Sequence, residues 1–165
     1  MFFISTAFSQ ECMFTKRKID SFTKKKVIII GGEVQRNMFG PTYTMNFMLK
    51  DDSLRIELAF SNVSFVKKEL IILKDEPMYI KLDNGSTVQL KALTDALESS
   101  INLEGTVVKM MEPMYSVTKD ELQKISSGLV TGIRVVISGK DYDVEVKPKQ
   151  GKKIQQALSC FLKEI

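Results

Sequence analysis

The chain has 165 residues, of which 44% are hydrophobic and 27% are charged, a composition typical of one soluble domain with one hydrophobic core. Its formal net charge of +4 reflects 24 basic and 20 acidic residues, an excess too small to indicate a nucleic-acid-binding protein by itself. Because the chain has no histidine and only two cysteines, Ser-His and Cys-His nucleophile pairs, histidine-ligated metals and cysteine zinc sites are excluded.

Residues 1–10 are apolar and then small and polar, and a basic, charged run follows directly. This pattern resembles the end of a secretory signal peptide whose basic start is missing. We therefore expect a signal-peptide remnant at residues 1–10 and a single α+β domain at residues 11–165. The alternative is an amino-terminal strand in which Phe2, Ile4 and Phe8 pack on the sheet. No apolar window reaches the ~20 residues that a transmembrane segment needs.

The basic run contains Lys16-Arg17-Lys18 and Lys24-Lys25-Lys26, interleaved with Phe14 and Phe22. Lysines beside stacking aromatic rings are what single-stranded nucleic acid binds, which gives one interpretation of this segment. The interpretation that we favour is a solvated strand edge, where lysines discourage pairing with other chains.

Alternating and β-branched segments predict most of the strands. These segments are residues 27–30, 43–49, 54–60, 78–82 and 88–90. Gly31-Gly32 should end the first of them as a turn or bulge, because no GxGxxG or Lys-Ser sequel makes it a phosphate loop. The turn at residues 50–53 joins one hairpin, and Asn84-Gly85 predicts a type I′ turn in another.

Residues 103–111 are expected to be one strand, which Glu112-Pro113 ends because proline has no amide hydrogen to donate. The spacing of Thr118 and Glu121 predicts a capping box that begins a short helix, with Gly128 as its left-handed C′ residue.

Two further elements complete the carboxyl-terminal part of the expected fold. Residues 133–137 and 142–146 predict a hairpin around residues 138–141, closed by Pro148. From Gly151 an apolar stripe predicts a terminal helix that packs on the sheet. We expect an α+β fold, mainly an antiparallel sheet of hairpins with about eight strands, a short internal helix and a carboxyl-terminal helix.

Several groups of side chains have both a functional and a structural interpretation. Asp51-Asp52 and the pair Asp141 and Asp143 are candidate acid/base or calcium pairs, but aspartate is common at hairpin turns, where we expect both. The lysines around the start of the terminal helix should be solvated. The methionines near the internal Pro113 could line an adaptable binding groove, but we expect them to fill the core. The lysines are Lys147, Lys149, Lys152 and Lys153, and the methionines are Met110, Met111 and Met114.

Two stretches resemble a family of small exported, uncharacterised proteins of Bacteroidetes-type bacteria. The first is Cys12 to Lys25, which is similar to that family's pattern of a cysteine, an aromatic and then Asp-x-Phe-Thr, here Asp20-Ser-Phe22-Thr23. The second contains Tyr115, the capped helix and Ile133-Arg134. Lys18 replaces an acid and Lys24 a glycine that the family often has. The resemblance implies export and an α+β fold, and it implies no activity.

The two cysteines, Cys12 and Cys160, are either two free thiols or one disulfide, which an oxidising compartment would permit. We expect a non-enzymatic binding or interaction module without cofactor or metal, although catalysis by lysine, tyrosine, arginine or carboxylate groups stays open. Export would place it in the periplasm or outside the cell, with a protein or a cell-envelope component as partner. The alternative is a cytoplasmic nucleic-acid-associated protein that uses the basic run.

Overall fold

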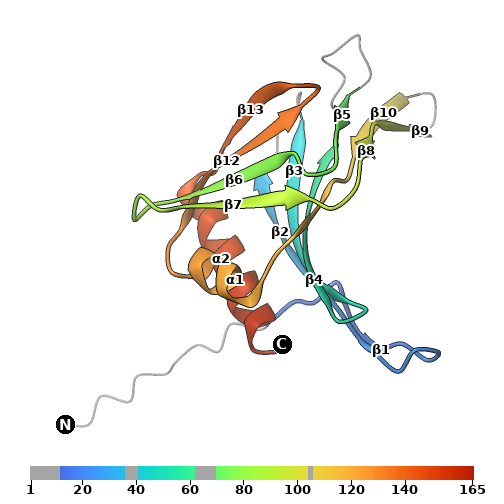
Figure 1. Ribbon diagram of the computed structural model, residues 1–165, viewed down its shortest axis with the longest axis vertical. Helices are drawn as coiled ribbons and strands as arrows, with labels where there is room; N and C mark the ends of the chain where they lie inside the picture. Colours follow the sequence, from blue (N-terminus) through green and yellow to red (C-terminus); the bar gives the residue numbers. More distant parts are fainter. Residues whose placement is uncertain (1–11, 36–40, 62–69, 104–105) are drawn as a thin grey trace.

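The computed structural model describes residues 12–35, 41–61, 70–103 and 106–165. They form a mainly antiparallel sheet with two helices, one short and internal and one carboxyl-terminal, as expected (Figure 1). The expected signal-peptide remnant, and the alternative strand containing Phe2, Ile4 and Phe8, lie outside the described residues. Among the helices of the described part, none is long and apolar enough to span a bilayer.

The described residues contain 13 strands, more than the alternation predicted, because several strands are too short to show a period of two. In chain order the strands are β1 Lys16–Ile19, β2 Lys26–Gln35, β3 Thr42–Lys50, β4 Ser53–Ser61, β5 Ile71–Ile72, β6 Pro77–Leu82, β7 Thr87–Ala92, β8 Ala96–Leu97, β9 Ser99–Leu103, β10 Thr106–Met111, β11 Met114–Ser116, β12 Val130–Ile137 and β13 Lys140–Glu145.

The main sheet has the order β1-β2-β3-β4-β11-β7-β6-β12-β13, and the β9–β10 hairpin pairs with β4 through β10. Short β11 joins the two halves of this sheet, because it pairs with β4 on one side and β7 on the other. Figure 1 shows β6 and β7 crossing in front of β2, β3 and β4. The sheet therefore folds over on itself and encloses the core between its two halves.

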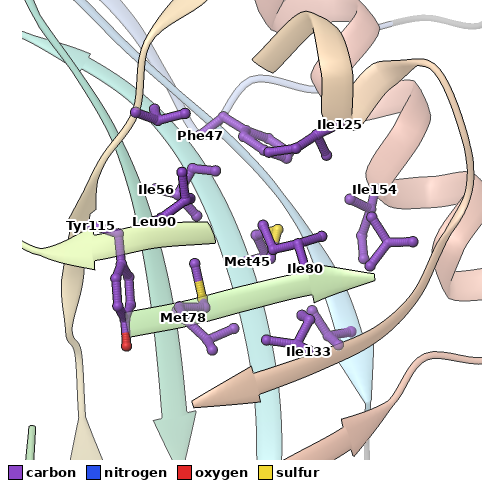
Figure 2. Packing of buried hydrophobic residues seen from close by; sticks show 14 of the residues in the cluster. Met45, Phe47, Ile56, Met78, Ile80, Leu90, Tyr115, Ile125, Ile133 and Ile154 are labelled. Carbon is purple, nitrogen blue, oxygen red and sulfur yellow. The ribbon is translucent and has the colours of Figure 1, made fainter. Parts of the chain in front are cut away.

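The core is formed by inward-facing apolar side chains from both halves of the sheet and from the helices (Figure 2). Met45 and Phe47 on β3 and Ile80 on β6 are fully buried, and so is Ile154 on the terminal helix. Because alternate residues of a strand face opposite sides of a sheet, strands such as β4, β6 and β7 each contribute one apolar face to this core, whereas β1 is exposed along its whole length.

Helix α1 spans Lys119–Ser126 and helix α2 spans Pro148–Leu162. The predicted capping box at α1 is present, with Thr118 accepting from the Glu121 amide and Glu121 accepting from the Thr118 amide. Helix α2 begins at Pro148, earlier than predicted, because proline suits the first turn of a helix, where its missing amide hydrogen leaves no bond unmade. It packs against α1, β2, β3 and β12.

Two predicted strand limits were wrong. Strand β2 continues through Gly31-Gly32 to Gln35, because β3 supplies a pairing partner along this whole length. Gly31 serves the close pairing with β3, since an added Cβ there would lie 2.9 Å from the Met45 carbonyl oxygen, whereas at Gly32 it would meet the Ile154 backbone nitrogen of α2 at an ordinary contact distance of 3.7 Å. Residues 103–111 are not one strand, because β9 and β10 form a hairpin there.

Two predicted backbone conformations, at Asn84 and at Gly128, were also wrong. In the β6–β7 turn Gly85 has a positive φ of 82°, whereas Asn84 does not have a positive φ. The turn is therefore not type I′, and the Asn84 side chain instead accepts a hydrogen bond from the Ser86 amide at 2.9 Å. Gly128 is not left-handed. An added Cβ there would lie 2.7 Å from Asp83 Oδ1, so this glycine serves a close approach of two segments.

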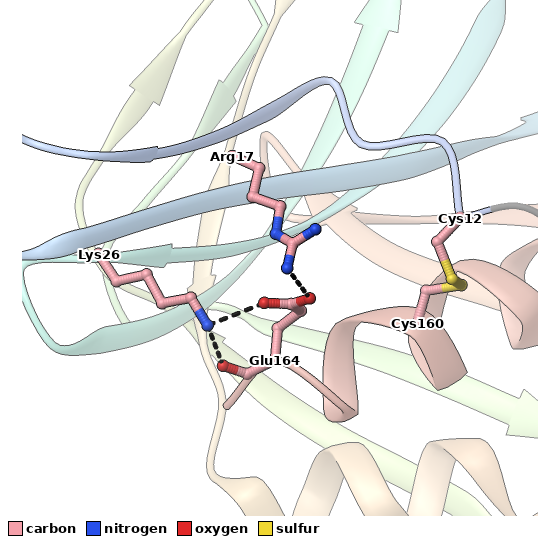
Figure 3. A network of polar contacts seen from close by, with 5 residues as sticks. All are labelled: Cys12, Arg17, Lys26, Cys160 and Glu164. Atoms are coloured by element: carbon pink, nitrogen blue, oxygen red, sulfur yellow. Dashed lines mark hydrogen bonds and ion pairs between the residues drawn. A yellow bond between two sulfur atoms is a disulfide. The ribbon is translucent and has the colours of Figure 1, made fainter.

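Cys12 and Cys160 form a disulfide, with their Cα atoms 5.8 Å apart (Figure 3). The sequence left open whether the two cysteines are free thiols or one disulfide, and the structure contains the disulfide. Cys160 lies off the apolar stripe of α2 and is nevertheless buried, because the amino-terminal segment covers that side of the helix. The segment that leads into β1 is therefore attached covalently to the terminal helix.

Candidate interaction surface

The hairpin formed by β1 and the start of β2 projects from the body of the molecule (Figure 1). Its register pairs Lys16 with Ile29 and Ile19 with Lys26. In the main sheet β1 is an edge strand, and its sheet neighbour is β2 alone. The basic run of the sequence thus forms a two-stranded projection, which we call the basic hairpin (residues 13–26).

Hydrogen bonds to Asp20 build the tip of the basic hairpin. The Asp20 carboxylate accepts from the backbone amides of Phe22 at 3.0 Å and Thr23 at 2.8 Å, and from the Thr23 hydroxyl at 3.1 Å. These bonds lower the pKa of Asp20, with the Thr23 amide as the largest cause. The Asp20 amide donates to the Lys25 carbonyl at 2.8 Å and closes the loop. The Asp-x-Phe-Thr motif is therefore a turn motif with a defined geometry.

Large apolar side chains of the basic hairpin are directed into solvent. Phe22 at the tip is 94% exposed, Ile19 is 69% exposed, and Met13 is 85% exposed. A single exposed apolar side chain needs no special explanation, but three on one projection make the hairpin a candidate interaction surface. The tip turn holds Phe22 outward, away from the core.

Ion pairs fix the base of the basic hairpin to the body. Glu164, just after α2, binds Arg17 and Lys26, each at 2.8 Å, beside the disulfide (Figure 3). The Lys26 ammonium and the Arg17 guanidinium lower the pKa of Glu164. Lys25 binds Asp52 of the β3–β4 turn at 2.7 Å, which raises the pKa of Lys25. The hairpin therefore projects at a defined angle.

Three cations of the basic hairpin remain available to a partner. Lys16, Lys18 and Lys24 are exposed, and none of them forms an ion pair within the described part of the chain. Because side chains alternate along a strand, Lys16 and Lys18 lie on the face of β1 opposite Arg17. Lys24 stands at the tip beside Phe22, with a left-handed φ of 59°.

The predicted interleaving of lysines with two stacking aromatics is not present. Phe14 is half-buried and packs against the core. The Arg17 guanidinium covers its ring, 5.4 Å from the ring centroid. Of the two aromatic rings that the sequence offered for stacking, the hairpin presents only Phe22.

A second feature is an open depression of about 680 Å³ over the outer face of β6, β12 and β13. Arg134 lies beside it and binds Asp143 with two nitrogens, at 2.6 and 2.7 Å, and Asp141 at 3.4 Å. The hydrogen bonds with Asp143 raise the pKa of Arg134 and lower the pKa of Asp143. The paired guanidinium keeps the Asp143 carboxylate ionised, which makes Asp143 a poor proton donor.

The two aspartate pairs lie in different surroundings. Asp51 and Asp52 form the predicted β3–β4 turn, both with positive φ. Asp141 and Asp143 were expected at the hairpin turn, and this was wrong. Both lie in β13, because Ser138-Gly139 alone completes the two-residue connection. In the described residues no group of three potential ligands is placed to hold a metal.

The remaining candidates from the sequence take structural positions. Lys147 is the N-cap residue of α2, and Lys149, Lys152 and Lys153 are exposed in its first turns. Met111 is buried, while Met110 and Met114 are half-buried. The sequence reasoning missed the exposure of Met13 and Ile19. It also missed the role of Asp20 in the tip, which the Asp-x-x-Thr spacing indicates.

No protein-family model matches the chain, and no curated protein or solved structure matches it. The resemblance to exported proteins therefore stays a prediction.

Proposed function

We propose that the protein is a non-enzymatic, exported binding module that engages an anionic partner through the basic hairpin. The observation that carries this proposal is the exposure of Phe22, 94%, on an ordered projection beside the unpaired cations Lys16, Lys18 and Lys24. An apolar anchor among cations is suited to a surface that is negatively charged and can accept an apolar side chain.

Three features support export. Residues 1–10 resemble the end of a signal peptide, and the resemblance to exported Bacteroidetes-type proteins includes the tip motif. The disulfide between Cys12 and Cys160 is stable in an oxidising compartment, such as the periplasm or the extracellular space. Mass spectrometry of the protein from its native cell should find residues 1–10 removed, and their retention would contradict export.

A nucleic-acid-associated protein is the weaker alternative. Single-stranded nucleic acid is bound by several aromatic side chains on which successive bases stack. Phe14 is occupied by Arg17 and the core, which leaves Phe22 as a single stacking surface. Arg17, Lys25 and Lys26 are already paired with carboxylates.

The first prediction tests the proposed binding surface with heparin as a model polyanion. The variant with Lys16→Gln, Lys18→Gln and Lys24→Gln should bind heparin at least about tenfold more weakly than the wild type, since each lysine near an anionic surface contributes on the order of 1 kcal/mol. Isothermal titration at low ionic strength measures the affinities.

The matched control removes the same charge elsewhere. The variant with Lys149→Gln, Lys152→Gln and Lys153→Gln changes exposed lysines of α2 and should bind heparin nearly as well as the wild type. An equal loss in both triple variants would show that only net charge matters and would refute a role for the hairpin.

A further inference from the structure

We infer that the anionic partner is a phospholipid bilayer, on which the protein docks peripherally with Phe22 inserted at the interface between headgroups and acyl chains. This inference rests on the proposed function and specifies its partner. It follows from the relative positions of the apolar and the basic groups on the basic hairpin.

Phe22 lies at the tip of the basic hairpin, which is the part of the hairpin that would contact a flat membrane surface first. The basic hairpin projects from the body, and the tip turn places Phe22 at its end. A protein partner would normally offer a pocket, whereas a bilayer accepts an aromatic ring anywhere along its interfacial region. Ile19 is exposed at the last position of β1 and adds apolar area next to the tip.

The cations lie where the headgroups would be. Lys24 is beside Phe22, and Lys18 and Lys16 follow along β1 at increasing distance from the tip. Lysines at this depth are attracted to anionic headgroups and also keep their ammonium groups hydrated. One signal alone gives marginal membrane binding, and an apolar anchor together with a basic cluster gives the two that stable docking requires.

The cations of the basic hairpin outnumber the carboxylates on it and beside it, which are Asp20, Asp51, Asp52 and Glu164. Asp20 accepts the hydrogen bonds of the tip, Asp52 binds Lys25, and Glu164 binds two cations. Asp51 lies in the same turn as Asp52 and forms no ion pair within the described part of the chain. The surface facing a bilayer therefore keeps a net positive charge.

The test uses tryptophan fluorescence, because the protein has no tryptophan of its own. Phe22→Trp places a single reporter at the tip of the full chain. With vesicles of phosphatidylcholine mixed with phosphatidylglycerol, its emission should shift to shorter wavelength and be quenched by brominated acyl chains. With pure phosphatidylcholine, or at high salt, neither change should occur, since screening removes the attraction.

The matched reporter is Leu97→Trp. Leu97 is also exposed, 65%, but lies on β8, at the opposite end of the molecule from β1 (Figure 1). Its emission should stay unchanged with every vesicle type. An equal shift at position 97 would show non-specific adsorption and would overturn the inference.

Vesicle flotation measures the affinity of each variant for the anionic vesicles, in proteins that differ from the wild type only at the substituted positions. Phe22→Ala should weaken binding about tenfold, the scale of a partly buried aromatic ring. Replacing Lys16, Lys18 and Lys24 by glutamine should weaken it on the order of 100-fold. Wild-type affinity in both variants would refute docking through the hairpin.

The two proposals fail in different ways. If heparin binding depends on the three lysines but vesicles of neither composition bind, the proposed function stands and the bilayer is the wrong partner. A protein with an acidic surface would then be the remaining class of partner. If the three lysines affect neither heparin nor vesicle binding, both proposals are wrong.

Discussion

Tyr115 is the largest fully buried side chain of the core, and its hydroxyl has no hydrogen-bond partner among the described residues (Figure 2). Its ring contributes to packing between the two halves of the sheet, from strand β11. A buried hydroxyl without a partner costs about 1–3 kcal/mol. Burial, and secondarily the charge of Glu76, raise the pKa of Tyr115. The ring therefore stabilises the fold, whereas the hydroxyl does not.

Tyr115→Phe should leave the free energy of unfolding unchanged or raise it by about 1 kcal/mol, because it removes the unsatisfied hydroxyl and keeps the ring. Above about pH 10 the tyrosine ionises in the unfolded chain but stays protonated in the core, so the wild type loses stability as pH rises. The variant lacks this loss, and its advantage should grow with pH. Urea unfolding at neutral and alkaline pH measures both effects. A clear destabilisation at neutral pH would show that the hydroxyl has a partner.

Lys24 combines a strained backbone conformation with an exposed charge. An L-residue in the left-handed conformation costs about 1–2 kcal/mol, which glycine avoids. At Lys24 the backbone φ is 59°. The lysine thus keeps a conformation that suits glycine and adds a cation at the tip.

At the scale of elements, local signals were sufficient for hairpins and for the capped helix. The β3–β4, β6–β7 and β12–β13 hairpins and the capping box at Thr118 are all present. These signals depend on residues close in sequence, so no tertiary contact is needed to interpret them. The conformation of Asn84 was predicted wrongly because its side chain bonds to the Ser86 amide instead.

Signals that depend on distant partners could not be interpreted from the sequence. Gly31-Gly32 was expected to end a strand, but pairing with β3 makes it part of one. For the candidate site, the cations and Phe22 were visible in the sequence. Which cations are neutralised was not, because Glu164 is 138 positions away from Lys26. The burial of Phe14 also depends on the distant core.

Gly151 shows why the terminal helix tolerates a poor helix former. An added Cβ there would lie 2.7 Å from the Val130 carbonyl oxygen, a backbone atom of β12 that cannot move aside cheaply. In an open helix, alanine would be more stable than glycine by about 1 kcal/mol. Here the close approach of α2 to the sheet outweighs that preference.

Gly151→Ala should therefore lower the free energy of unfolding by about 1–3 kcal/mol, the usual cost of overpacking. The matched control, Ser159→Ala on the exposed side of α2, should change it by no more than about 0.5 kcal/mol. Urea unfolding of the two variants gives the comparison. A stabilised Gly151→Ala protein would mean that α2 is not held tightly against β12.

At the scale of the whole molecule, the strand order joins distant parts of the chain. Strand β11 lies between β4 and β7, and the β6–β12 pairing brings two separate hairpins into one sheet. Many patterns of hairpins are compatible with the same alternating sequence, so this order was not predictable. The amino-terminal edge of the sheet is then attached to the carboxyl-terminal helix by the disulfide and by the ion pairs of Glu164.

The disulfide closes almost the whole chain, since Cys12 and Cys160 are 148 positions apart. In the chain-entropy account, such a closure destabilises the unfolded state by up to about 4–5 kcal/mol. The variant with Cys12→Ala and Cys160→Ala should therefore unfold at a clearly lower urea concentration than the oxidised wild type. Alanine avoids placing a hydroxyl at the buried position 160.

Reduction provides the internal control for this last prediction. Dithiothreitol should lower the urea midpoint of the wild type towards that of the double variant and should leave the double variant unchanged. The ion pairs of Glu164 with Arg17 and Lys26 remain in both proteins, so the difference isolates the covalent link. If the oxidised wild type and the double variant share one urea midpoint, the bridge adds no stability. The basic hairpin would then be held in place by its ion pairs and strand pairing alone.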